Sequence, residues 1–283
     1  MKKSITQNIG FTVLFLCVLV TIAFLGLMLF FIVARGAGVI SWEFLTQVPR
    51  NGMTSGGVAP AMLGTLYLAL GAIILALPAG LACAIYLCEY TPRGLAVNLI
   101  RISVNNLAGV PSVVFGLFGL AVFVKFFKLG VCLFSGMLTL GILALPVIIS
   151  ASQEAIIAVP HSLREASLAL GATKWQTIRK IVLPTALPGV LTGVILSLGR
   201  VAGETAPIIF TAAAFYLRGY PDSIFSEVMA LPYHVYALMT EGTHPDQQTA
   251  IAYGCCLILL FLVILISLAA IFMRQKQRSG QNG

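Results

Sequence analysis

Long apolar runs, without alternation between apolar and polar positions, dominate this sequence. A helix needs about 20 mostly apolar residues to cross the hydrocarbon core of a bilayer. Segments that meet this requirement lie at about 11–33, 64–87, 107–127, 133–151, 187–209 and 251–273. Strands of a membrane barrel would alternate in polarity, so continuous runs favour helices. The pattern predicts an all-α membrane protein with six transmembrane helices.

The composition agrees with a lipid environment. Apolar residues make up 59% of the 283 positions and charged residues 9%, and the mean hydropathy is +1.01. Soluble domains carry about 25% charged residues. The sequence contains no internal repeat and no low-complexity linker, so we expect one multi-pass membrane domain over residues 1–283.

Basic residues are divided unequally between the two sides of this arrangement. One side carries Lys2, Lys3, Arg93, Arg101, Arg164, Lys174, Arg179, Lys180, Arg274, Lys276 and Arg278, and the other carries Arg35, Arg50, Lys125, Lys128 and Arg218. Because cytoplasmic loops hold the excess of Lys and Arg, we expect both termini in the cytoplasm. Topology thus accounts for the net charge of +8 without a nucleic-acid partner. The first apolar run exceeds the about 7–15 residues of a signal peptide, which favours an anchor that stays in place.

Six cysteines lie in or beside apolar runs, and their spacing is not that of metal ligands. The neighbours Cys255 and Cys256 leave redox chemistry open, although cysteine in an apolar helix more commonly serves as a small packing residue. A membrane-embedded enzyme would need a cluster such as paired His or Asp residues with a nucleophile. The sequence shows no such cluster. We therefore expect no cofactor and no metal site in this chain.

The connection 152–186, expected in the cytoplasm, holds the most informative pattern. Leu163, Ala166 and Leu170 fall near one face of a short helix that is expected to end near Gly171. A second short helix is expected to end at Pro184. The basic residues around this apolar hairpin are Arg164, Lys174, Arg179 and Lys180. Such a hairpin suits docking on another protein, or resting on lipid headgroups.

One series of residues in this connection has a demanding spacing. It consists of Glu165, Ala166, Ser167, Gly171, Ile181, Leu183 and Pro184. The series resembles the EAA loop of permease subunits in binding-protein-dependent ABC importers, with Ser167 in place of the usual third Ala. The resemblance implies a type I ABC importer permease-like bundle, in which this loop is a coupling helix that docks on an ATP-binding subunit.

Further stretches at 56–60, 64–65, 86–90, 107–116 and 199–207 resemble the PstA-type phosphate permeases. This resemblance implies a permease core at about 60–273 and an inner-membrane subunit of an ATP-driven phosphate importer that works by alternating access. It also implies a second related permease, two ATP-binding subunits and an extracytoplasmic phosphate-binding protein. The chain has no G-x-x-x-x-G-K-[ST] run, so ATP and Mg²⁺ are expected on the partner ATPase, and this chain is expected not to be an enzyme. The outer loop 211–250 either contacts the binding protein or caps the bundle.

Two ionisable residues, Arg200 and Glu204, lie within the fifth apolar run. Charges at that depth are costly and usually face a protein interior or a wet cavity. Their spacing places them on one helical face, so they either neutralise each other or serve the substrate pathway. In the second case Arg200 would attract an oxyanion, since a guanidinium binds two oxygens at once. The alternatives are a permease for another oxyanion and an ion-coupled secondary transporter. Secondary transporters often carry several carboxylates within the membrane, whereas this chain has one deep in a span.

Overall fold

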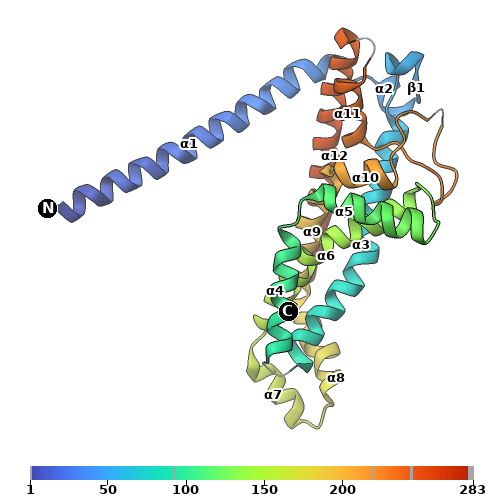
Figure 1. Ribbon diagram of the computed structural model, residues 1–283. Coiled ribbons are helices and arrows are strands. Elements are labelled where there is room, and N and C mark those ends of the chain that lie inside the picture. The colour runs from blue at the N-terminus through green and yellow to red at the C-terminus, as the bar shows by residue number, and fades with distance from the viewer. Residues whose placement is uncertain (1, 92–93, 218, 243–244, 280–283) are drawn as a thin grey trace.

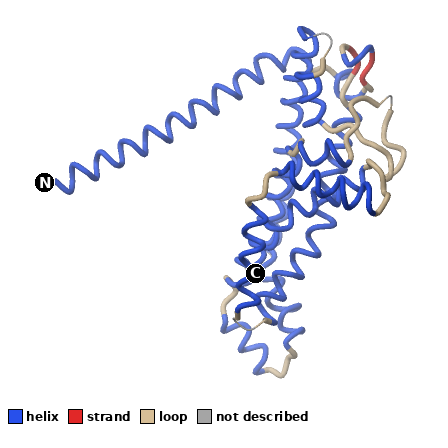
Figure 2. The backbone as a smooth tube through the Cα atoms, in the orientation of Figure 1, coloured by secondary structure: helices blue, strands red, loops and turns tan. Residues whose placement is uncertain are grey.

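The computed structural model describes residues 2–91, 94–217, 219–242 and 245–279, mostly as helices (Figure 2). The long helices are α1 (Lys2–Gly36), α3 (Ala59–Ile85), α6 (Leu133–Ile157), α9 (Leu183–Gly203) and α12 (Pro245–Ser279). Five stretches in the described part are long and apolar enough to span a membrane, and a bent pair of helices makes a sixth if it counts as one span. The prediction of an all-α membrane protein is confirmed.

The body is elongated, and its two ends differ (Figure 1). At one end, called here the hairpin end, α7 (His161–Ala169) and α8 (Lys174–Thr177) project from the bundle. The opposite end, called here the far end, carries the short elements α2 (Trp42–Thr46), β1 (Pro49–Arg50), η2 (Asn51–Met53), β2 (Ser55–Gly56) and α11 (Leu231–Thr240). The two strands pair antiparallel, with Pro49 opposite Gly56.

Helices α3, α6 and α9 form the centre of the body. Their largest shared cluster of buried side chains includes Leu68, Leu140, Leu143, Ile148 and Leu198. Small residues allow the helices to approach closely, as is usual in membrane bundles. A Cβ atom added to Gly193 of α9 would lie 2.5 Å from that of Ala151 on α6. Helices α6 and α9 therefore approach each other closely at this point.

Helix α1 leaves this body at a steep angle (Figure 1). None of its most apolar 18-residue window is buried within the chain. It joins the body through η1 (Ala37–Val39) near its C-terminal end, where the Arg35 guanidinium lies 5.5 Å from the ring centroid of Tyr253 on α12. The exposed apolar surface of α1 suits lipid or another membrane helix.

The third expected span, 107–127, is not a single straight helix. Helix α4 (Leu95–Ala108) and helix α5 (Ser112–Gly119), which continues as the π-helical turn η4 (Leu120–Phe126), meet at a bend of 101°. Pro111 stands between them, and a proline disfavours helical geometry at the residue before it and supplies no N–H group. Apolar character continues through the bend, which explains why the pattern predicted one span.

The prediction that a short helix ends at Pro184 is also wrong. The chain runs as one helical stretch over Lys174–Gly203, because α8 passes through the π-helical turn η5 (Ile178–Val182) into α9. Pro184 sits in the first turn of α9. The Leu183 N–H donates to the Ile178 carbonyl, a wider turn than in an α-helix. This wider turn accommodates a proline that would clash with the preceding turn of a regular helix.

Candidate functional site

The projecting hairpin turns at Gly171, as the sequence predicts. Gly171 has φ of +83°, in the left-handed region that glycine adopts without strain. Its N–H donates to the Leu168 carbonyl at 3.0 Å, and the Ala172 N–H donates to the Ser167 carbonyl at 3.2 Å. These two bonds form a Schellman motif, which satisfies the last carbonyls of α7.

The second arm of the hairpin begins with a capping box at Thr173. The Thr173 hydroxyl accepts from the Gln176 N–H at 3.3 Å, and the Gln176 side chain accepts from the Thr173 N–H at 2.8 Å. The hydroxyls of Ser167 and Thr177 lie 2.9 Å apart and join the two arms. Ser167, which departs from the usual Ala of the EAA loop, therefore contributes a hydrogen bond across the hairpin.

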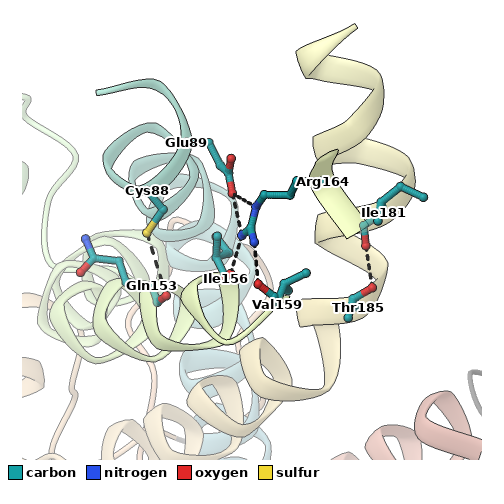
Figure 3. Close-up of polar contacts among 8 residues, drawn as sticks. All are labelled: Cys88, Glu89, Gln153, Ile156, Val159, Arg164, Ile181 and Thr185. Atoms are coloured by element: carbon teal, nitrogen blue, oxygen red, sulfur yellow. Dashed lines mark hydrogen bonds and ion pairs between the residues drawn. The ribbon is translucent and has the colours of Figure 1, made fainter. Parts of the chain in front are cut away.

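Arg164 ties the hairpin to the bundle (Figure 3). Its Nε and Nη2 donate to Glu89 Oε1 at 3.1 and 3.0 Å. Nη2 also donates to the Ile156 carbonyl at 2.8 Å, and Nη1 donates to the Val159 carbonyl. Glu89 lies in the π-helical turn η3 (Tyr86–Tyr90), which extends α3. The Ile156 carbonyl lies in the last turn of α6, and the Val159 carbonyl lies just past the end of that helix. The side chains of Arg164 and Glu89 are 13% and 11% exposed.

This arrangement corrects the expectation that Arg164 belongs to a basic rim around the hairpin. Carbonyl groups at a helix C-terminus attract cations, and a carboxylate beside them strengthens that attraction. The guanidinium is therefore drawn inward. Lys174, Arg179 and Lys180 do lie exposed on the surface, and the Lys174 ammonium is 5.1 Å from the ring centroid of Tyr90.

Four exposed apolar side chains of the projecting hairpin are together called the hairpin patch here. Its members and their exposed fractions are Leu163 41%, Leu168 49%, Leu170 89% and Trp175 53%. No residue of α7 is buried. Large exposed apolar side chains on a projecting tip, with charged residues beside them, are typical of an interaction site. The hairpin patch has the character of a docking surface for another protein.

The residues of the EAA-like series divide into three groups. Glu165 and Ala166 are exposed on α7, beside the hairpin patch. Ser167 and Gly171 shape the hairpin through the contacts described above. Ile181, Leu183 and Pro184 lie where the second arm enters α9, and Ile181 and Leu183 are half-buried there.

Arg200 and Glu204 do form an ion pair, but not along one helix. Arg200 Nε lies 3.5 Å from Glu204 Oε1, and the side chains are 37% and 16% exposed. Helix α9 ends at Gly203, and Glu204 is extended, with φ of −73° and ψ of 128°. The chain then restarts as α10 (Ala206–Thr211), because Pro207 lacks the N–H that would continue α9. Among the hydrogen bonds and ion pairs between described residues, Arg200 takes part only through Nε, and neither Nη group has a partner there.

A cleft of about 580 Å³ lies beside the Arg164–Glu89 pair. Glu89 from η3, Asn98 and Arg101 from α4, and His161 and Arg164 from α7 contribute to its walls. From the sequence, Glu89 could be singled out only as part of the family-like stretch 86–90, because a pair 75 residues apart leaves no local pattern. Among residues 2–91, 94–217, 219–242 and 245–279, no group of three or more His, Cys, Asp or Glu side chains is placed to hold a metal ion.

Residues 76–277 match the family model described as "Binding-protein-dependent transport system inner membrane component". The chain belongs to this family. It is 31% identical to the probable ABC transporter permease protein YqgI of Bacillus subtilis, over 95% of both chains. It is 36% identical to the phosphate transport system permease protein PstA 1 of Mycobacterium tuberculosis H37Rv, over 97% of this chain and 89% of that one. Identity to the corresponding PstA of Mycobacterium leprae is 37%, over 94% and 88%.

Solved ABC transporters share the fold of this permease. One chain of a bacterial alginate ABC transporter superposes with a TM-score of 0.68 at 17% identity, covering 97% of this chain and 96% of that one. A chain of the inward-facing methionine transporter MetNI gives a TM-score of 0.61 at 22% identity, covering 77% and 94%. The permease is thus a multi-pass inner-membrane transport subunit rather than an enzyme, and it functions with ATP-binding and substrate-binding partners.

Proposed function

We propose that this permease imports phosphate, using ATP hydrolysed on a partner chain. Similarity to two phosphate permeases over nearly the whole chain supports this substrate. The observation that carries the proposal is Arg200, a half-exposed guanidinium at the end of a membrane helix, held through one nitrogen by Glu204. Its two Nη groups can present paired donors to a tetrahedral oxyanion.

The energy of ATP hydrolysis would reach this chain through a docking contact at the hairpin end. The hairpin patch, with Glu165 and Ala166 beside it, would enter a cleft on an ATP-binding subunit that holds ATP and Mg²⁺. Closure of that subunit would move the hairpin, and α9 would move with it, because the helical stretch Lys174–Gly203 links the hairpin to Arg200. Alternating access to Arg200 from the two sides would follow.

The assembly would contain this permease, a second related permease, two ATP-binding subunits and an extracytoplasmic binding protein. A docking hairpin must face the cytoplasm, where ATP is present. Helix α12 runs from the far end toward the hairpin end (Figure 1), so its C-terminus would lie on the cytoplasmic side. Helix α1 meets α12 at the far end, so its N-terminus would return to the cytoplasm.

Substitution of Arg200 tests this proposal directly. In the assembled transporter we expect Arg200→Gln to abolish ATP-driven uptake of labelled phosphate, while co-purification of all subunits is retained. Arg274→Gln is the matched control, because it also removes a guanidinium from the end of a membrane helix, where Arg274 donates to the Thr192 hydroxyl at 3.0 Å. This control should retain uptake. Normal uptake by Arg200→Gln would refute the role of Arg200.

A further inference from the structure

We infer that Arg164 and Glu89 form a clamp that passes movement of the hairpin to α3. This inference rests on the proposed coupling role of the hairpin. The chain itself connects the hairpin to α6 and α9, its neighbours in sequence, but α3 is separated from it by the whole of α4, α5 and α6. Helix α3 therefore depends on side-chain contacts to follow the hairpin.

The clamp consists of four hydrogen bonds donated by one guanidinium. Two nitrogens of Arg164 converge on one carboxylate oxygen of Glu89, while the same guanidinium donates to carbonyls at the end of α6. Three elements thus meet on one planar group, which has a fixed orientation once its donors are satisfied. Both side chains are nearly buried, so water competes weakly for these bonds.

A second contact ties the Cys88 thiol of η3 to the same end of α6. The thiol donates to the Gln153 carbonyl at 3.9 Å (Figure 3). The hairpin end of α3 is therefore fixed to α6 as well as to α7.

Helix α3 also reaches the neighbourhood of the Arg200–Glu204 pair. It packs along α6, where a Cβ atom added to Gly80 would lie 2.8 Å from Ile148 Cγ2. Near its other end, Thr65 and Leu68 line the same small pocket as Glu204. The Thr65 hydroxyl also accepts from the Leu231 N–H of α11 at 2.8 Å. Packed elements therefore connect the clamp to the Arg200–Glu204 pair, and such packed networks can carry energetic coupling between distant sites.

The test measures phosphate imported per ATP hydrolysed, in vesicles that contain the assembled transporter. Glu89→Gln removes the charge on α3 and leaves Arg164 its two carbonyl partners. Couplings between sites are typically worth roughly 5- to 150-fold, so we expect the import ratio to fall about tenfold. The pair acts as one unit, so the double variant Glu89→Gln/Arg164→Gln should fall no further than Arg164→Gln alone.

Two comparisons separate coupling from simple stability. Glu89→Asp keeps the negative charge, so the phosphate imported per ATP hydrolysed should be higher than in Glu89→Gln. Arg101→Gln removes a guanidinium from the wall of the same cleft, where Arg101 makes no ion pair with any described residue, and it should keep the wild-type ratio.

The inference is overturned if Glu89→Gln keeps the wild-type ratio, even when less complex assembles, because the pair would then be merely structural. It is equally overturned if Arg101→Gln lowers the ratio as much. If the wild type imports another oxyanion, the ratio is measured with that ion. Failure of the phosphate assignment is therefore distinct from failure of the clamp.

Discussion

Replacement of Gly171 by alanine isolates the contribution of the hairpin turn. Gly171 has φ of +83°, and a Cβ atom there would meet nothing within 4 Å, so backbone strain is the whole perturbation. An L-residue in the left-handed region costs about 1–2 kcal/mol. Relief by unwinding would break the two hydrogen bonds from Gly171 and Ala172, each worth about 1 kcal/mol, so the two states become comparable in free energy.

The expected result of Gly171→Ala is weaker docking. If all the strain is relieved in the undocked hairpin, the affinity for the ATP-binding subunit falls by up to roughly 5–30-fold. The assay is titration of the purified permease with that subunit, followed by ATP-driven uptake. Asparagine tolerates left-handed geometry better than alanine does, so Gly171→Asn should lose less affinity for the ATP-binding subunit.

Gly130 supplies the matched control. It has φ of +76°, also with open space around it, and lies in the loop before α6, away from the hairpin. Gly130→Ala should cost a similar free energy of unfolding and leave docking unchanged. Wild-type docking by Gly171→Ala, or equal weakening by Gly130→Ala, would refute the reasoning.

Two further predictions concern the opposite ends of the molecule. Leu170→Asp changes a residue that is 89% exposed, so thermal stability should stay unchanged while affinity for the ATP-binding subunit drops at least about tenfold; titration showing unchanged affinity would contradict this. Burial lowers the pKa of His234 on α11 from 6.5 to about 4, so the unfolded chain binds a proton before the folded one does. Stability present above pH 6.5 should therefore decline as the pH falls to 4, by about 3 kcal/mol in total. Unfolding temperatures should follow this decline in the wild type and in the exposed control His161→Gln but not in His234→Gln, and a flat wild-type profile would contradict it.

The apolar pattern predicts the spanning helices well because lipid exposure demands long apolar runs whatever the neighbouring packing. It cannot locate breaks inside such runs. The bend before Ser112 and the end of α9 at Gly203 both depend on local backbone geometry beside a proline, while the apolar character continues across them. Pro184 shows the opposite error, because a π-helical turn lets the helix pass through a residue that normally ends one.

The site was predictable to a similar extent. The left-handed turn at Gly171 follows from its residue type. The sequence also suggested that Arg200 and Glu204 pair, but it placed both on one helical face, whereas Glu204 lies beyond the end of α9. The inward position of Arg164 does not, because it depends on Glu89, 75 residues earlier, and on carbonyls exposed by the end of α6. Only the tertiary arrangement brings these groups together.

Uptake by the complete transporter tests the central claim most directly. Membrane vesicles containing the permease and all its partner subunits would receive labelled phosphate or labelled sulfate, with ATP supplied or withheld. The account predicts phosphate uptake that requires ATP, with no uptake of sulfate. Sulfate uptake without phosphate uptake would contradict the substrate, and uptake that ignores ATP and follows an ion gradient would contradict the ATP-driven mechanism itself.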